Sequence, residues 1–179
     1  AYIFDGDNAA ATGTTQGSNS SFVVNSVAPI VTSVSVNNGQ SITLEESTTV
    51  GVDITATVTS DNSCQSISDV KAYLYRSGEG YAKCSSSSDA DNNYCYTEIS
   101  CNVNSGTCTG PTDKSADYTC TASVWYYADP TDTQTLHDSE NWLATVKGTV
   151  GNATGTGQSS GVEMNSLVAF SVTETLNYG

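Results

Sequence analysis

Residues 48–60, TTVGVDITATVTS, alternate apolar and polar side chains without interruption. Val50, Val52, Ile54, Ala56 and Val58 all fall on the even-numbered positions. Successive side chains of a β-strand point to opposite faces, so this pattern predicts a long strand with one buried face. No segment of a dozen residues places apolar side chains at helical spacing. We therefore expect the chain to be built from strands.

The same alternation recurs further along the chain, with turn-forming residues between the segments. Residues 69–76, 118–127 and 141–150 are expected to be strands, with Trp142, Ala144, Val146 and Val150 buried in the last of them. In the first, the pattern places Val70, Ala72 and Leu74 in the core and Tyr73 and Tyr75 on the outer face. Shorter strands are expected at residues 21–24, 30–36, 41–44, 96–100 and 167–173.

Short strands at regular intervals, without helices, predict an all-β fold in which two antiparallel sheets form a sandwich. A closed barrel is the alternative, and the sequence discriminates poorly between the two. We divide the chain into an N-terminal arm (1–27), the β domain (28–163) with a cysteine-rich insertion (76–120), and a C-terminal strand (164–179). The insertion is expected to be a loop-rich region stapled by disulfides.

The six cysteines all lie within one third of the chain: Cys64, Cys84, Cys95, Cys101, Cys108 and Cys120. They lack the closely spaced pairs of a zinc site and the Cys-x-x-Cys of a redox site. The remaining interpretation is three disulfides, which predicts an oxidising, extracellular location. Many pairings are compatible with six cysteines. We expect Cys101–Cys108 and Cys84–Cys95 to close short loops, and Cys64–Cys120 to join two strands.

The charge of the chain excludes some partners. With 5 Lys and Arg against 19 Asp and Glu, the formal net charge is −14. A nucleic acid would be repelled, because the chain has no basic stripe that could displace its counterions. No apolar run approaches the roughly 20 residues that a helix needs to cross a bilayer. We therefore expect no nucleic-acid partner and no direct membrane insertion.

Three segments carry a resemblance to a known group of domains: APIVTSVSV, YTCTASVWYYADPTD and ENWLATVKGTVGNATG. They resemble the immunoglobulin-like domains of secreted prokaryotic cell-surface proteins. The resemblance covers residues 28–163 and implies an immunoglobulin-like β-sandwich with a structural or adhesive role on a microbial exterior. The cysteine-rich insertion departs from the plainest members of that group, so ligands are not inferred from them.

No catalytic motif is found. The sequence has no G-x-S-x-G, no P-loop and no H-E-x-x-H, and GTVGNATGTG leads from a strand into a turn rather than into a helix. The only histidine, His137, lies in the polar stretch TLHDSEN, where a solvated side chain is the plainer interpretation than a base or metal ligand. We expect a protein that is not an enzyme and that requires no cofactor.

Calcium is the metal for which the chain offers candidates, because hard cations are held by several oxygen ligands on a tight loop. Asp89, Asp91 and Asn93 have the first spacings of an EF-hand loop, but the glycine and glutamate that should follow are missing. Asp5 with Asp7, and Asp129 with Asp132, are weaker candidates. Solvated acidic turns are the alternative at each position.

Surface chemistry suggests two kinds of sugar contact. Trp125 and Tyr127 fall on the face opposite the predicted core, where flat rings can stack on a glycan; packing under a loop or against another subunit is the alternative. Asn19 in NSS and Asn152 in NAT match the N-glycosylation pattern.

The two ends of the chain suggest how copies could associate. AYIF is an apolar tetrapeptide followed by a polar stretch, and it could complete the sheet edge of a neighbouring subunit. VEMNSLVAFSVTETL could supply or receive the complementary edge. Both ends folding back on their own domain is the alternative, and a module from a tandem array is a third. We expect an extracellular, cell-surface structural subunit that self-associates into a filament or layer. An adhesin or carbohydrate-binding module is the runner-up.

Overall fold

The computed structural model describes residues 26–86 and 91–167. Its regular structure is almost entirely β, as the alternation predicts. The strands are β1 Ile30–Val36, β2 Thr49–Thr59, β3 Ile67–Arg76, β4 Cys95–Val103, β5 Ser115–Trp125, β6 Trp142–Val150 and β7 Ala153–Gln158. The helical turns are η1 Asn37–Gly39, η2 Cys64–Ser66 and α1 Gly80–Cys84.

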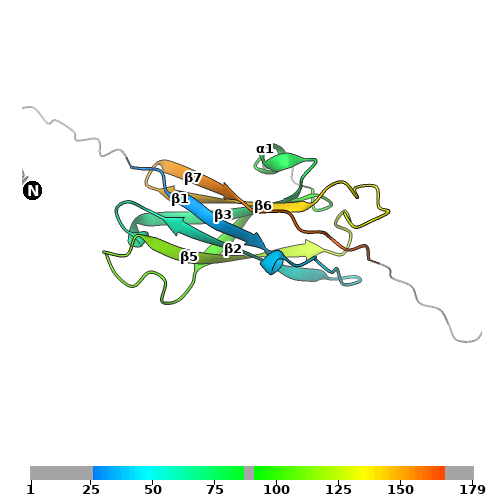
Figure 1. The fold of residues 1–179 in the computed structure, drawn as a ribbon, viewed down its shortest axis with the longest axis horizontal. Helices are drawn as coiled ribbons and strands as arrows, with labels where there is room; N and C mark the ends of the chain where they lie inside the picture. Colours follow the sequence, from blue (N-terminus) through cyan, green and yellow to red (C-terminus); the bar gives the residue numbers. More distant parts are fainter. Residues whose placement is uncertain (1–25, 87–90, 168–179) are drawn as a thin grey trace, which may run out of the picture.

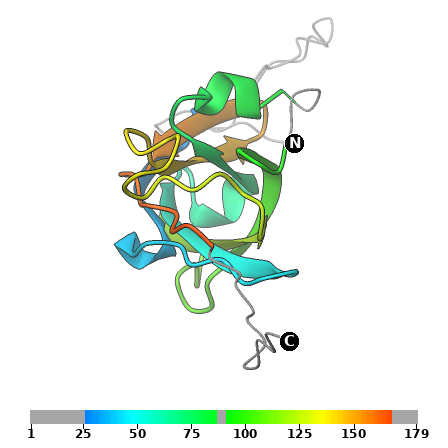
Figure 2. The ribbon, with the colours of Figure 1, turned by 90° about the vertical axis from the view of Figure 1, so that its right-hand side faces the viewer.

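All strand pairs are antiparallel, and they form one sheet in the order β1-β2-β5-β4-β3-β6-β7. The sheet curls until β1 and β7 lie side by side, which gives a nearly closed barrel (Figures 1 and 2). The all-β antiparallel prediction is confirmed, whereas the two-sheet immunoglobulin-like sandwich is not. The reason is β4, which pairs with β3 through residues 95–100 and with β5 through residues 101–103, and so joins the two halves.

Glycine allows β1 to close the barrel against β7. A Cβ atom at Gly155 would overlap the carbonyl oxygen of Pro29, and one at Gly157 would lie 2.6 Å from the carbonyl oxygen of Val31. Both distances are far below an ordinary van der Waals contact. The glycine-rich hairpin of β6 and β7 is therefore a surface on which the backbone of β1 packs directly.

On β2 and β6, the side chains that the alternation predicts to face inward lie in the core. Val52, Ile54 and Val58 of β2 are buried, and Trp142 of β6 is fully buried. The predicted outer face of β3 is wrong, because Tyr73 and Tyr75 are also buried. They form a second cluster with Tyr81 and Cys84 of α1 and with Cys95 of β4.

The structure pairs the six cysteines as Cys64–Cys108, Cys84–Cys95 and Cys101–Cys120. The Cys84–Cys95 pair agrees with the expectation, and the other two expected pairs are wrong. Cys101 and Cys120 face each other across the β4–β5 ladder with their Cα atoms 4.1 Å apart. That adjacency depends on which strands are neighbours, and a short spacing in sequence does not reveal it.

Two other expectations need revision. The segment 76–120, expected to be a loop-rich insertion, contains β4 and part of β5 and so belongs to the barrel itself. Residues 41–44 form no regular strand; Ile42 makes an isolated parallel bridge with Met164. The strands expected at 21–24 and, apart from Leu167, at 167–173 lie outside the described residues.

The described chain begins and finishes at opposite ends of the barrel (Figure 1). Ser26 lies against Gly151 in the turn between β6 and β7, and we name this the Ser26 end. At the other end, residues 162–167 lie across the barrel opening with the loop 126–141, and we name this the Leu167 end (Figure 2). Met164 is fully buried there, so packing continues past residue 163. Within the described residues, no helix is long and apolar enough to cross a membrane.

Candidate functional site

Three consecutive aromatic residues, Trp125, Tyr126 and Tyr127, form an exposed ridge at the Leu167 end. Each is between 38% and 42% exposed. The rings of Trp125 and Tyr127 are stacked with their centroids 5.8 Å apart, and Tyr126 meets Tyr127 edge to face at 5.2 Å. We call these three residues the aromatic ridge. The two residues predicted to stack on a ligand therefore lie together on the surface.

Tyr96 of β4 supports the ridge from beneath. Its hydroxyl accepts a hydrogen bond from the Trp125 N–H at 2.9 Å and donates one to the Asn92 carbonyl oxygen at 2.7 Å. Burial raises the pKa of Tyr96 to about 12, so the phenol stays protonated at any physiological pH. The Tyr96 hydroxyl thus accepts a hydrogen bond from the backbone of β5 at a point where β4 no longer pairs with that strand.

We expect Tyr96→Phe to lower the free energy of unfolding by about 1–2 kcal/mol, because two hydrogen-bonding groups lose their partner. Urea denaturation followed by tryptophan fluorescence measures this. Tyr118→Phe is the matched control, since the ring of Tyr118 is also buried and its hydroxyl has no hydrogen bond to any of the residues that the structure describes. Equal losses in the two variants would contradict a role for the Tyr96 hydroxyl.

A groove runs between β4 and β5 beside the ridge, where the two strands separate beyond Cys101–Cys120. Every residue that lines it is uncharged, and Asn92, Ser100 and Ser123 are among them. In a chain with a formal net charge of −14, such a neutral surface is a distinct chemical environment. Its hydroxyl and amide groups can hydrogen-bond a neutral polar ligand.

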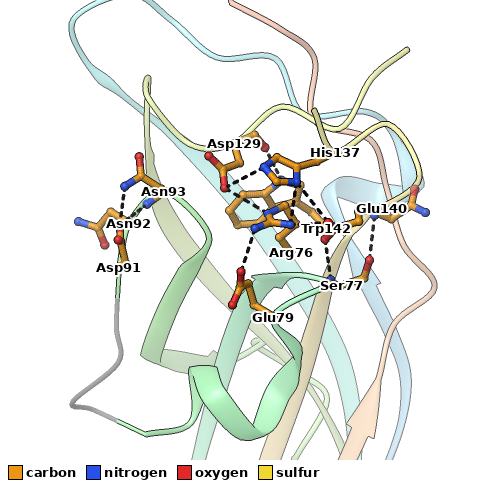
Figure 3. Close-up of polar contacts among 12 residues, drawn as sticks. Arg76, Ser77, Glu79, Asp91, Asn92, Asn93, Asp129, His137, Glu140 and Trp142 are labelled. Carbon is orange, nitrogen blue, oxygen red and sulfur yellow. Dashed lines mark hydrogen bonds and ion pairs between the residues drawn. The ribbon is translucent and has the colours of Figure 1, made fainter. Parts of the chain in front are cut away.

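The loop 126–141, which carries part of the ridge, is held to the barrel by Arg76 at the end of β3 (Figure 3). The guanidinium is almost completely buried, and it contacts carboxylates from three places in the chain. Its nitrogen atoms lie 3.0 Å from Glu79, 3.1 Å from Asp129 and 2.5 Å from Glu140. The fork of five N–H donors suits arginine to this position. We call these four residues the Arg76 cluster.

His137 is part of the same set of contacts. Its Nδ1 lies 3.0 Å from Arg76 Nη1, which can only donate, and 3.2 Å from Glu140 Oε1, which as a carboxylate oxygen can only accept. Partial burial acts to raise the pKa of Glu140, but hydrogen bonds from Gly78 N–H and Arg76, with the positive charge of Arg76, hold it below its usual value. The cluster is therefore an ion-paired anchor rather than a free acid–base pair.

Residues 162–167 are fastened beside this loop by hydrogen bonds. The backbone N–H and hydroxyl of Ser166 both donate to Asp132, at 2.9 and 2.6 Å, and lower the pKa of that carboxyl. Met164 N–H donates to the Thr131 hydroxyl at 2.9 Å. The first part of VEMNSLVAFSVTETL therefore packs on its own domain, and residues 168–176 of it lie outside the described residues.

The calcium candidates are not brought together by the described part of the chain. Asp91 Oδ1 accepts hydrogen bonds from the backbone and side-chain nitrogen atoms of Asn93, at 2.9 and 2.6 Å, in a closed turn (Figure 3). Asp89 lies outside the described residues. Asp129 and Asp132 face different partners. Among residues 26–86 and 91–167, no group of three or more His, Cys, Asp or Glu is placed to hold a metal, and the calcium site stays a prediction.

The remaining candidates divide between the surface and the undescribed termini. Asn152 is exposed in the β6–β7 turn, as a glycosylated asparagine must be, and its modification stays a prediction. Asn19, Asp5 and Asp7 lie outside the described residues. Arg76 was not among the residues predicted from the sequence. The available signal was that the only arginine of so acidic a chain closes a predicted strand.

No known protein family and no curated protein matches the sequence. Among solved structures, the chain is similar to the crystal structure of AggA, the major subunit of aggregative adherence fimbriae type I from Escherichia coli. The match covers 79% of this chain and 98% of that chain, with 13% sequence identity and a TM-score of 0.25. At this TM-score the likeness carries no argument about the fold or function of this chain.

Proposed function

We propose that this chain is a structural subunit of an extracellular filament or cell-surface layer, whose copies associate head to tail through their terminal segments. One observation carries the proposal: the chain arrives at one end of the barrel and leaves at the other (Figure 1). Each copy therefore offers two unlike ends. A repeated contact between unlike ends continues as an open assembly unless its rotation happens to close a ring.

The chemistry of the chain supports an extracellular location. All six cysteines are paired in three disulfides, which persist in oxidising compartments. An assembly outside the cell cannot rely on continuous refolding by the cell, so covalent cross-links suit such a subunit. This role involves no catalysis and no required cofactor.

The N-terminal segment is the better candidate for the strand that joins copies. Residues 162–167 already contact their own domain, whereas AYIF precedes the Ser26 end by more than twenty residues. At roughly 3.3 Å per residue, residues 5–25 could extend up to about 70 Å, well beyond the length of a barrel strand. AYIF could therefore reach an exposed sheet edge of the next copy and add a strand to it.

Electron microscopy of unreduced protein tests the proposal. We expect the full chain to form filaments or arrays, and we expect a chain lacking residues 1–16 to remain as single particles. Ile3→Asp in the full chain should have the same effect, because a buried charge is costly. Thr14→Asp adds the same charge within the polar stretch and should still assemble. Single particles in every sample would rule out the filament.

A cell-surface adhesin or carbohydrate-binding module is the second candidate function. The observation in its favour is the uncharged groove beside the aromatic ridge, since stacking rings and neutral hydrogen-bonding groups together suit a sugar. A protein of this kind would stay monomeric and lose glycan binding when Trp125 is replaced by alanine. A glycan array probed with the unchanged chain and with Trp125→Ala separates this function from assembly.

A further inference from the structure

We propose that the aromatic ridge and Leu136 at the Leu167 end dock on Val27 and Ile30 at the Ser26 end of a second copy, and so form the apolar centre of the contact between subunits. This inference rests on the filament proposed above and adds a surface to it. It concerns the folded barrel, and it is separate from the strand that the N-terminal segment would contribute.

The distribution of exposed apolar side chains carries the inference. The described residues include seven large apolar side chains that are clearly exposed, and six of them lie at the two ends of the barrel. Leu136 is 91% exposed on the loop beside the aromatic ridge, and Ile30 is 61% exposed at the first residue of β1. The seventh, Val103, ends β4 and pairs with Tyr118 of β5; in the sheet order it lies three strands away from Ile30 of β1. Such concentration at two opposite ends is unexpected for a protein that works alone.

The size and composition of the patch fit the centre of a protein interface. Aromatic residues are enriched in such centres, where a few of them provide most of the binding energy. With about two fifths of each ring exposed, the three aromatics offer roughly 60–100 Å² each. A stable interface buries about 800 Å² on each partner, so the ridge alone is too small. Additional contact must come from elsewhere, and the terminal segments leave the barrel beside these same two patches.

The path of the chain favours a second copy as the occupant. Twenty-five residues of the sequence precede Ser26, which lies at the same end of the barrel as Val27 and Ile30. Twelve residues follow Leu167, which lies at the same end as the ridge. When copies are placed end to end, the N-terminal segment of one starts next to the ridge of its neighbour. One junction would then combine the apolar patches with the segment proposed to add a strand.

The charge of the chain gives this contact a characteristic salt dependence. Copies with a formal net charge of −14 repel one another, and Glu45, Glu46 and Asp138 add exposed acidic groups near the Leu167 end. Salt screens repulsion between exposed charges and leaves apolar contact intact. Assembly should therefore strengthen as sodium chloride rises from 10 to 300 mM.

Light scattering and electron microscopy of the full chain test the inference. Trp125→Ala removes the ridge, and Ile30→Lys removes the opposite patch at a residue exposed enough to tolerate the change. We expect each to raise the protein concentration needed for assembly at least tenfold. Leu136→Lys, at the most exposed position, repeats the first test without risk to folding. Val103→Lys is the matched control and should assemble as the unchanged chain does.

Mixing the variants tests the pairing of unlike ends. Trp125→Ala keeps an intact Ser26 end, and Ile30→Lys keeps an intact Leu167 end, so an equimolar mixture should give particles of two copies. Assembly of all variants like the unchanged chain would overturn the inference; if Ile3→Asp still abolished assembly, the filament would stand. Trp125→Ala that assembles normally but loses glycan binding would assign the ridge to a sugar instead. If the unchanged chain never assembles, the filament falls and this contact falls with it.

Discussion

Gly155→Ala should lower the free energy of unfolding by about 3 kcal/mol or more, although it adds a single methyl group. The new Cβ atom would overlap the carbonyl oxygen of Pro29, which belongs to the backbone. A flexible side chain could move aside, but this carbonyl is held by the β1 strand that follows it. The closure of the barrel between β1 and β7 would have to open.

Thermal unfolding followed by circular dichroism measures the effect, and we expect the Tm to fall by roughly 10 °C. Gly110→Ala is the matched control, because a Cβ atom there meets nothing within 4 Å. It should leave stability unchanged or raise it slightly, since alanine restricts the unfolded chain. If both variants unfolded at the same temperature, β1 would not pack on β7 as closely as the structure shows.

This contact marks the limit of what the sequence could predict. Alternation identified β2, β3, β5 and β6 because each of these strands has one face toward the core, and burial imposes a period of two. The closure depends instead on Gly155 and Gly157 lying opposite Pro29 and Val31. Those residues are more than 120 positions apart, and nothing local indicates that their strands meet. The sequence showed a glycine-rich hairpin but not what packs on it.

The outer face of β3 was misassigned for a related reason. Tyr73 and Tyr75 alternate with core residues and therefore looked exposed, yet Tyr81 of α1 packs on them. A helix of five residues has too few positions for a periodic signal. The disulfide Cys84–Cys95 ties this helix to β4. The bond therefore keeps in place a helix that is too short to be stable alone.

The candidate site was predicted in part. Trp125 could be placed on the surface because its position opposes the core of β5, and the structure has it exposed; Tyr127 is exposed as well. That their rings stack could not be derived, because Tyr127 lies beyond the end of the strand, where the alternation no longer applies. The cluster that holds this loop joins residues 76, 79, 129 and 140, which come together only in the folded chain.

Arg76→Met should lower the free energy of unfolding by about 3 kcal/mol. The substitution keeps much of the side-chain volume but leaves Glu79, Asp129 and Glu140 without their shared cation. These carboxylates are still 21–26% exposed, so water reduces the cost below that of a fully buried group. Lys114→Met removes the same charge from an exposed position and should change stability little. Urea denaturation at pH 7 compares the two.

The pH dependence separates lost ion pairing from lost packing. In the unchanged chain the pKa of Glu140 is lowered by folding, so its contribution is fully present above the usual carboxyl pKa of about 4 and disappears as the pH falls through the lower folded value. The difference in the free energy of unfolding between the unchanged chain and Arg76→Met should therefore shrink as the pH is lowered from 5 to 2. A difference that stayed constant would mean that the arginine acts through packing alone.

Arg76 also connects stability to the proposed contact between copies. Asp129 and Glu140 lie in or at the end of the loop that carries Tyr127 and Leu136, so weakening the cluster should loosen the surface offered to a neighbour. Arg76→Met should then raise the concentration needed for assembly even at temperatures where the barrel remains folded. Arg76→Lys keeps the charge but not the fork of donors, so the concentration it needs for assembly should lie between that of the unchanged chain and that of Arg76→Met. Normal assembly by a folded Arg76→Met chain would show that the junction does not depend on this loop.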